Sequence, residues 1–263
     1  MTGRQLARVS AVKYGETVWS GLYPGNRQTV QCLQPAVLGT EFALELAPEQ
    51  CQRVVWRLDG GAGSDDKLRW LLARGYQVIA KGFSNARAQK LARQVQRWDP
   101  YGDGWVGEVV PPVAYGRPVR VFVKRTYQRE RWQHAYFIST LKLPAKGRYL
   151  ACYDARGGAE VEQFRQDKQA LFLAAKRKHR FQAQKGFLLL ADLTHNLLAH
   201  FRRHALADSR FAAYGLQRLV RDLLATPGRL TFAGSQLTRV DLLTQKQNAE
   251  ALKNCLQRYL LHG

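Results

Sequence analysis

The chain has 263 residues, 46% of them hydrophobic, which excludes a disordered tail and allows a large domain with a substantial core. Its 41 Lys and Arg residues stand against 20 Asp and Glu, a formal net charge of +21. This surplus favours a polyanionic partner, and nucleic acid is favoured over membrane because no basic amphipathic anchor is evident. A basic protein with a solvated surface is the alternative.

The four cysteines are scattered without a CxxC pair, at Cys32, Cys51, Cys152 and Cys255. This spacing supports neither a disulfide framework nor a zinc site and indicates reduced thiols. No stretch approaches the roughly 18 to 20 apolar residues that cross a bilayer. The N-terminal sequence lacks the apolar core of a signal peptide. We therefore predict a cytoplasmic protein.

The first part of the sequence alternates between strand and helix patterns. The predicted elements are strands 4–12 and 16–23 joined as a hairpin, a helix from Leu33 to about Leu46, a strand 53–58, a helix that opens at Ser64 and stops at Gly75, and a strand in QVIAKGF at 77–83. A strand, a helix and a strand at this spacing predict a parallel pair in a sheet covered by helices.

The composition changes after residue 104. The remaining predicted elements are a basic helix 84–98, an antiparallel β segment from Trp105 to about Leu150, two long helices at 158–181 and 185–204, and a basic tail that favours helix. The β segment is rich in Val, Tyr, Phe and Arg, and RPVRVFVKRTY at 117–127 alternates as a strand does. We interpret it as an insertion into the α/β fold.

The stretch VVWRLDGGAGSDD, residues 54–66, ends an apolar strand in a carboxylate, Asp59, which Gly60 and Gly61 follow. Reactive groups gather beyond the carboxyl ends of strands in open α/β sheets. A carboxylate there, with glycines that let the backbone turn sharply, suits a Mg²⁺ ion. The alternative is an aspartate that merely begins a turn.

A second acid lies in YDARGGAEVEQFRQDK, residues 153–168. On a helix that begins near Gly158, Glu160 shares a face with apolar residues, because side chains three, four and seven positions apart point the same way. A buried glutamate needs a partner or a metal. Arg156, Arg165 and Lys168 surround it with cations suited to phosphate. A surface pair between Arg156 and Glu160 is the alternative.

These segments resemble a DDE-type insertion-sequence transposase whose third acid lies in a tyrosine–x2–arginine–x3–glutamate–x6–lysine signature. Tyr153, Arg156 and Glu160 match this spacing. Seven residues rather than six separate Glu160 from Lys168, and Asp167 occupies the expected place of the lysine. RLDGGAGSDDKLRWLLARGYQVIAKG resembles the region of the second acid, and ADLTHNLLAHF resembles the terminal core helix. The resemblance covers about residues 3–205.

The resemblance implies a ribonuclease-H-like α/β catalytic domain, incomplete at its N-terminus, with a β insertion between its second and third acids. The implied divisions are 1–104 for the first part of this domain, 105–150 for the insertion, 151–205 for the glutamate and core helices, and 206–263 for a helical tail. It also implies DNA as the partner, a homodimer when complete, and two Mg²⁺ or Mn²⁺ ions held by three carboxylates. Asp59 and Glu160 would be the catalytic metal ligands.

The first aspartate of such a site has no match in this sequence. The first acid is Glu16, on the second strand of the predicted hairpin, whereas the resemblance places the first aspartate ahead of that hairpin. We therefore expect the chain to correspond to the C-terminal part of a transposase, either a remnant or a gene read from an internal methionine. Alone, it should bind DNA without cutting it.

Two further segments are candidates for DNA contact beside Tyr153, Arg156, Arg165 and Lys168. KRKHR at 176–180 places Lys176 and Arg177 on a predicted helix, where a solvated helix end is the alternative. Trp132 lies among cations in VFVKRTYQRERWQHAYF, and related transposases stack a base on this insertion, although tryptophan is more often core. His195, His200 and His204 have loose spacings, which favour core or surface roles over a metal cluster.

Two other functions stay open at this point. The first is a catalytically silent DNA-binding protein derived from a transposase, which would tolerate the loss of Asp59. The second is a nuclease that uses Asp59 and Glu160 with a different third ligand. Candidates for that ligand are Asp65, Asp66 and Asp167.

Overall fold

The computed structural model describes residues 3–155, 157–173, 178–244 and 248–262, without the side chains of 157–163 and 261–262. The chain forms two compact units. Unit 1 consists of Met1–Val9 and Val18–Ala159, and unit 2 of Ser10–Thr17 and Glu160–Gly263. Each unit has hydrophobic clusters of its own.

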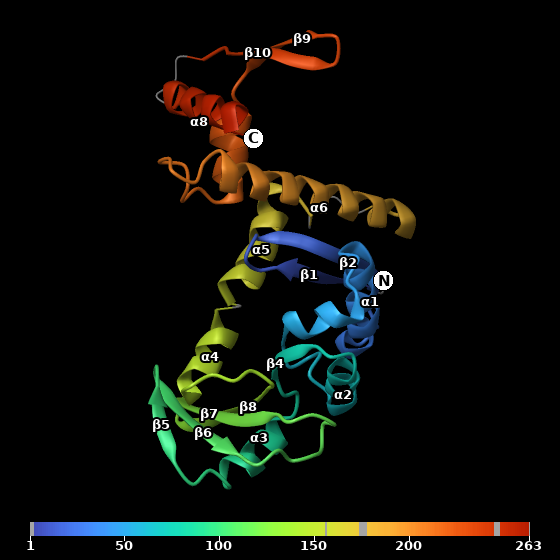
Figure 1. The fold of residues 1–263 in the computed structure, drawn as a ribbon, viewed down its shortest axis with the longest axis vertical. Coiled ribbons are helices and arrows are strands. Elements are labelled where there is room, and N and C mark those ends of the chain that lie inside the picture. The colour runs from blue at the N-terminus through green and yellow to red at the C-terminus, as the bar shows by residue number, and fades with distance from the viewer. Residues whose placement is uncertain (1–2, 156, 174–177, 245–247, 263) are drawn as a thin grey trace. The chain divides into compact units, whose positions relative to one another are not determined.

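A mixed six-stranded sheet with the order β3-β4-β8-β7-β6-β5 forms the body of unit 1 (Figure 1). Its strands are β3 (Val55–Leu58), β4 (Gln77–Lys81), β5 (Trp98–Tyr101), β6 (Gly104–Val109), β7 (Arg120–Gln128) and β8 (Arg131–Ser139). β3 and β4 run parallel, and the other neighbouring pairs are antiparallel. The predicted α/β class and the predicted parallel pair are confirmed.

The β-rich segment continues the sheet of β3 and β4 rather than forming a sheet apart. Ile79 of β4 pairs with Ser139 of β8, so the hairpin of β7 and β8 lies next to the parallel pair. Arg129 and Glu130 make the tight turn of this hairpin, and both have positive φ. That conformation suits a two-residue turn between strongly twisted strands.

Helices cover this sheet and connect its strands. They are α1 (Leu33–Ala43), α2 (Asp65–Ala73), α3 (Asn85–Ala92) and α4 (Lys146–Asp154), with short 3₁₀ turns at Thr29–Cys32 and Pro48–Arg53. α2 begins after Ser64 and ends before Gly75, which has a φ of +90°. Both predicted ends of α2 are confirmed, and the positive φ explains the glycine.

One helical prediction in unit 1 is wrong, and one helix was not predicted. The basic helix predicted for 84–98 ends at Ala92, because the chain must turn back for β5, which begins at Trp98. Val95 in this connection packs on Gly107 of β6, where an added Cβ would lie 2.1 Å from a Val95 methyl carbon. Helix α4 was not predicted, because its sequence was included in the β segment.

The core of unit 1 lies on both faces of the sheet. Val78 and Ala80 of β4 belong to the cluster under α2 and α3, whereas Ile79 belongs to the cluster under α4. This alternation follows from the two-residue period of a strand. β4 is therefore buried on both faces, as its unbroken apolar run Val78-Ile79-Ala80 requires.

Unit 2 is mainly helical, and its elements differ from the prediction. They are α5 (Gly157–Ala170), α6 (Phe181–His204), α7 (Leu216–Arg218), a π-helical turn at Leu219–Leu224, β9 (Gly228–Ala233), β10 (Gln236–Leu242) and α8 (Ala249–His262). The helix predicted for 158–181 is shorter, and the one predicted for 185–204 begins earlier. The tail contains a β-hairpin as well as helix.

The N-terminal hairpin of β1 (Arg4–Ala11) and β2 (Glu16–Pro24) confirms its prediction and forms a two-stranded sheet of its own. Its tip belongs to unit 2 and packs on α6. Asn196 donates to the carbonyl of Thr17 and accepts from its amide, both at 2.8 Å. Arg203 pairs with Glu16 at 2.9 Å. Glu16 is thus held in a structural ion pair.

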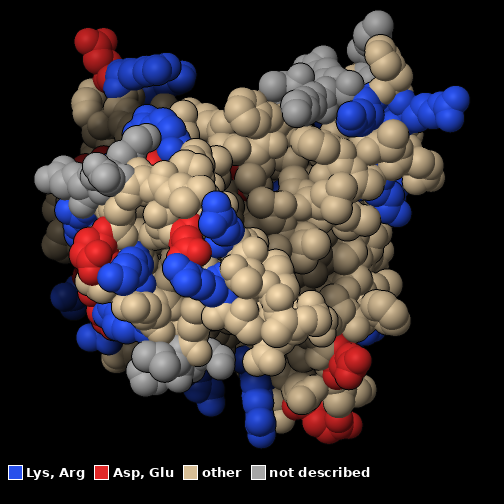
Figure 2. Space-filling model, turned by 90° about the horizontal axis from the view of Figure 1, so that it is seen from above, with Lys and Arg blue, Asp and Glu red and all other residues tan. Residues whose placement is uncertain are grey.

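Lys and Arg side chains outnumber Asp and Glu side chains on the face drawn in Figure 2. They are spread in separate groups, and wide areas between them carry neither sign. No helix among the described residues is long and apolar enough to cross a membrane. The four cysteines are free thiols.

The pair of Glu108 and Arg120 predicts an acid-dependent stability. Arg120 donates to both carboxylate oxygens of Glu108 across β6 and β7, at 2.7 and 2.6 Å, and this hydrogen bonding holds the pKa of Glu108 below its ordinary value of 4.5. A lowered pKa stabilises the folded state above that value and ceases to do so as pH falls through the folded-state pKa. Glu108→Gln should cost about 0.5–1 kcal/mol at pH 7 and progressively less as pH falls below 4.5, with a smaller cost at pH 3 than at pH 7.

Urea unfolding at both pH values measures this difference. Glu130→Gln, an exposed change in the β7–β8 turn, is the matched control and should leave stability within about 0.5 kcal/mol at either pH. An equal cost of Glu108→Gln at both pH values would contradict the assignment.

Candidate catalytic site

Asp59 directly follows β3, at the carboxyl end of the parallel pair. Because Leu58 lies opposite Ala80, Asp59 and Lys81 end neighbouring strands at the same edge of the sheet. The Asp59 side chain is exposed, and its Oδ1 accepts a hydrogen bond from the amide of Gly61 at 3.1 Å. This contact also suits a turn aspartate. The place of the carboxylate, beyond a strand end, is the one that favours chemistry.

The glycines after Asp59 let the loop approach β4 closely. A Cβ added at Gly63 would lie 2.3 Å from the carbonyl oxygen of Lys81, so a side chain there would force the loop away. Gly60 lies near Gly82, but without a comparable clash. The loop that carries Asp59 can therefore follow this path, close against Lys81, only with glycine at position 63.

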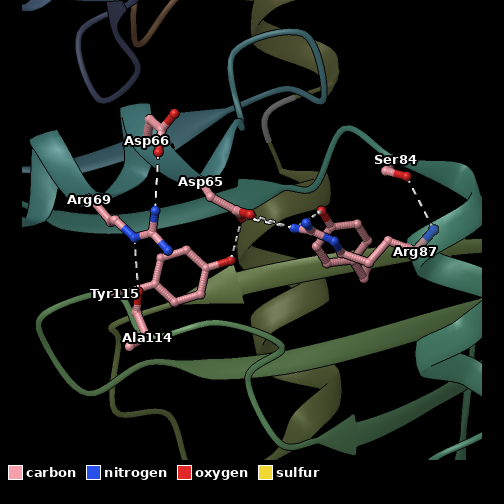
Figure 3. A network of polar contacts seen from close by, with 8 residues as sticks. Asp65, Asp66, Arg69, Ser84, Arg87, Ala114 and Tyr115 are labelled. Carbon is pink, nitrogen blue, oxygen red and sulfur yellow. Dashed lines mark hydrogen bonds and ion pairs between the residues drawn. The ribbon is translucent and has the colours of Figure 1, made fainter.

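A network around Asp65 anchors the other end of this loop (Figure 3). Asp65, the first residue of α2, accepts from Arg87 Nη1 at 2.7 and 2.9 Å and from the hydroxyl of Tyr115 at 2.8 Å. Arg87 also donates to the hydroxyl of Tyr136 at 3.4 Å. The hydrogen bonds that Arg87 donates to Asp65 raise the pKa of Arg87. Burial, and after it the hydrogen bond to Asp65, raises the pKa of Tyr115. α2, α3 and β8 are thereby held together where the Asp59 loop ends.

The other candidate third ligands also have structural partners. Asp66 points away from Asp65 in Figure 3 and pairs with Arg69 at 3.1 Å. Asp167 is fully buried in unit 2, where its Oδ1 lies 2.8 Å from Nδ1 of His195. The Nε2 of His195 lies 2.8 Å from the carbonyl oxygen of Gly15. Asp65 and Asp167 thus act as anchors of the fold.

A hollow of about 580 Å³ in unit 1 brings Tyr153 of α4 together with Lys81. Tyr153 is buried, and its ring packs edge-on against Phe137 with centroids 4.8 Å apart. Most charged residues that line the hollow are basic: Lys81, Lys124, Arg129 and Arg131, against Asp103 and Asp154. The hollow therefore suits an anionic ligand that reaches the edge where β4 ends.

Asp154 is tied to its surroundings. It accepts from the hydroxyl of Tyr101 at 2.9 Å and lies 4.0 Å from Nζ of Lys124. Burial, followed by the contact with Asp154, raises the pKa of Tyr101 to about 12. Tyr101 thus stays protonated and donates to the carboxylate at neutral pH.

Several predicted site residues lie wholly or partly outside the described residues. Glu160 belongs to α5, but its side chain is not described, and Arg156, Lys176 and Arg177 lie outside the description altogether. Arg165 and Lys168 are exposed on α5 in unit 2. Within the described residues, no three His, Cys, Asp or Glu side chains group as metal ligands.

Trp132 lies in a cluster of aromatic rings around one arginine. The guanidinium of Arg125 lies 4.2 Å from the ring centroid of Trp98, 4.8 Å from that of Trp132 and 5.8 Å from that of Trp105. Trp132 and Trp105 are exposed, and Trp132 also meets Tyr127 edge-on. Trp98, Arg125 and Trp132 line a second hollow of about 290 Å³. Trp132 is thus a surface ring rather than core.

The matched family model decides the identity of the chain. Residues 20–260 match the family described as transposase DDE domain group 1. The chain belongs to this family of DDE transposases. The predicted family is therefore confirmed, and with it transposition as the function class and DNA as the substrate of the family's enzymes. DDE domains generally use divalent metal ions. A search of the curated proteins found no match.

Sequence reasoning missed two parts of this DDE domain. It did not foresee that Arg87 and Tyr115 would meet Asp65, because these residues lie 22 and 50 positions from it. It also did not foresee the rings around Arg125. The alternation of RPVRVFVKRTY does place Arg125 on the face opposite Lys124, which was an available signal.

Asp65 and its neighbour Asp66 allow a matched test of the network. Asp65→Asn removes the charge that compensates partly buried Arg87 and should lower the free energy of unfolding by about 1–3 kcal/mol. Asp66→Asn changes a side chain that is 91% exposed and should cost less than about 0.5 kcal/mol. Urea denaturation of both variants measures the difference. Equal effects would show that the network does not anchor α2.

Proposed function

We propose that this chain carries two of the three carboxylates of a DDE transposase, Asp59 and Glu160, in a ribonuclease-H-like domain. The observation that carries the proposal is the place of Asp59, at the carboxyl end of the parallel pair in a confirmed DDE family member. The match of Tyr153, Arg156 and Glu160 to the family signature supports the second carboxylate. The four predicted segments of the chain remain part of this proposal.

The carboxylate of Asp59 suits Mg²⁺ or Mn²⁺, because it is a hard oxygen donor on an exposed loop and the hydrogen bond that it accepts comes from a backbone amide. Asp59 and Glu160 would hold the ions, which supply Lewis-acid stabilisation of phosphoryl transfer when bound. Gly63 keeps the Asp59 loop against β4, and the Asp65 network keeps its far end in place. The protein's own contribution is thus a fixed carboxylate beside a basic hollow.

DNA would be held by cations and by one exposed ring. Lys81, Lys124, Arg129 and Arg131 line the hollow beside Tyr153. The signature residue Arg156 and the α5 residues Arg165 and Lys168 extend the proposed contacts, together with Lys176 and Arg177. Trp132 offers an exposed face for base stacking. Two transposon ends would engage two copies of the chain.

The isolated chain should bind DNA without cutting it. No acid precedes Glu16, and Glu16 is paired with Arg203, so the third carboxylate has no candidate ahead of the hairpin in these 263 residues. A catalytically silent DNA-binding protein derived from a transposase is the second candidate. The net charge of +21 supports this second candidate as much as the first, because a positive charge favours DNA binding whether or not the protein is catalytic.

The test incubates the purified chain with supercoiled plasmid and transposon-end DNA in Mg²⁺ and in Mn²⁺. We expect binding whose log affinity falls linearly with log salt concentration, because released counterions drive it. We expect no metal-dependent cutting, and Asp59→Asn should leave binding unchanged. Cutting that Asp59→Asn abolishes would contradict the inactivity of the isolated chain, and an absence of DNA binding would contradict both candidates.

The stacking role of Trp132 has a separate test. Trp132→Leu should weaken the binding of single-stranded DNA by roughly 5- to 150-fold, because stacking contributes about 1–3 kcal/mol per base. Phe42→Leu, at an exposed aromatic residue on α1, is the control and should not change the affinity. Fluorescence anisotropy with a labelled oligonucleotide measures both. Equal affinity of the two variants would exclude Trp132 as a stacking platform.

A further inference from the structure

His195 of α6 is buried between two hydrogen-bond acceptors. Its Nδ1 lies 2.8 Å from Oδ1 of Asp167 on α5, and its Nε2 lies 2.8 Å from the carbonyl oxygen of Gly15 at the tip of the N-terminal hairpin. Only 4% of His195 is exposed, and Asp167 is fully buried. All three residues belong to unit 2, so both contacts lie within one compact unit. We call Asp167, His195 and the carbonyl group of Gly15 the histidine latch.

The two contacts of His195 need two hydrogen atoms. A carbonyl oxygen has none to donate, so Nε2 must carry one to bond to Gly15, and the contact with Asp167 needs a second, on Nδ1 or on the carboxyl group. A neutral ring beside an ionised carboxylate has only one, which leaves two buried acceptors facing each other. Such a contact is costly away from water. The geometry is therefore satisfied when Asp167 and His195 together hold both hydrogens, and the pair then has no net charge.

Charged groups face the latch from α6 and from the hairpin tip. Asp192, three residues before His195 on the buried face of α6, is a second acid, and a negative charge there favours a protonated ring. At the tip, Glu16 is paired with Arg203 at 2.9 Å. Arg203 also donates to the carbonyl of Tyr14 at 3.2 Å. The charge of Glu16 is therefore compensated next to the latch.

The other helices at the latch bring exposed cations and apolar side chains. Arg165 and Lys168 lie near Asp167 in α5 but are exposed, so salt and water screen their charges. Asp167 itself occupies the place where the family signature has lysine, and a lysine there would present a cation instead of an acceptor to His195. α7 packs on α5 and α6 through uncharged side chains, namely Ala170, Leu198 and Leu216.

The hairpin tip has one contact with α6 that depends on an imidazole proton. Gly15 has a φ of +67°, which favours glycine, so the carbonyl that His195 binds belongs to a tight turn. Asn196, the next residue of α6, bonds to the amide and the carbonyl of Thr17, both at 2.8 Å. These two bonds do not change with pH, because a side-chain amide does not titrate. The bond of His195 to Gly15 can be lost with a proton.

From this we propose that the histidine latch is a pH-dependent device. It docks the hairpin tip on α6 while Asp167 and His195 hold two hydrogens, and it releases the tip when the pair loses one. Away from the latch, an imidazole is mostly neutral above about pH 6.5 and a carboxyl group is ionised above about pH 4, so the undocked pair holds one hydrogen at neutral pH.

The direction of the pH dependence follows from this count of hydrogens. Docking takes up a proton above about pH 6.5, so the docked state loses stability as pH rises beyond that value. Below about pH 4 the undocked pair holds a third hydrogen, and docking weakens again. The latch lies within unit 2 and its test needs no DNA, so the outcome is independent of the proposed function.

Amide hydrogen exchange of Thr17 in the full chain measures docking, because this amide bonds to Asn196 in the docked tip. We expect its protection factor, corrected for the intrinsic exchange rate, to fall about tenfold per pH unit between roughly pH 7 and 9, because opening releases one proton. Asp167→Asn should abolish this slope, because its amide N–H supplies the second hydrogen without titrating. His204→Gln is the control. His204 is exposed on α6 and accepts from Arg203 at 3.2 Å, and its replacement should leave the slope unchanged.

NMR of the unaltered chain with nitrogen-15-labelled histidine keeps the proposal testable if Asp167→Asn fails to fold. At about pH 8 we expect His195 to show two protonated ring nitrogens, or a protonated Nε2 beside an uncharged Asp167 carboxyl group, which the carbon-13 shift identifies. A neutral ring beside an ionised Asp167 in the docked protein would overturn the inference, as would Thr17 protection that does not change with pH. A slope that Asp167→Asn retains and His204→Gln removes would assign the pH dependence to the contacts of Arg203 instead.

Discussion

The structure of unit 1 depends on the position of β4 between a parallel and an antiparallel neighbour. β4 pairs with β3 on one side and with β8 on the other, and Val78, Ile79 and Ala80 are buried on its two faces. The pairing with β3 sets the strand end from which Asp59 projects. The pairing with β8 joins the β-rich segment to the same sheet. The candidate carboxylate Asp59 and the basic hollow therefore belong to the same sheet, joined through the short apolar strand β4.

The surplus of positive charge shapes how this DDE domain uses its acids. Glu108 is held by Arg120, Asp65 by Arg87 and Glu16 by Arg203, and each pair joins elements that are distant along the chain or lie on different strands. A buried or half-buried cation needs such a partner. Arg125 instead lies over the rings of Trp98 and Trp132, at 4.2 and 4.8 Å from their centroids. Acids that serve as anchors in this way are poor metal ligands, because binding a metal would release the cation that each holds.

The sequence correctly predicted those elements whose strand pattern or helix ends are set by neighbouring residues. The alternation in 4–23, the apolar runs of β3 and β4, and the Ser64 and Gly75 ends of α2 all appear in the structure. The predicted helix 84–98 is wrong beyond Ala92, because Val95 packs on Gly107 of β6 and Trp98 begins β5 and packs on Arg125. These are tertiary contacts, which the local sequence does not indicate. The β-hairpin of the tail and helix α4 were missed for similar reasons. At the site, the place of Asp59 was predictable, but the partners of Asp65 and Asp167 were not, because they come from remote elements.

These partners bear on which acid is free for chemistry. Asp65 and Asp167 were alternative candidates for the third ligand. Asp65 accepts hydrogen bonds from Arg87 and Tyr115, and Oδ1 of Asp167 lies 2.8 Å from Nδ1 of His195. Asp66 pairs with Arg69 on the surface. Among the described residues, the carboxylate of Asp59 accepts one hydrogen bond, from the amide of Gly61 in its own loop. Gly63 and the Asp65 network fix that loop at its far end. A carboxylate that the fold positions but does not use is the one expected to act on a ligand.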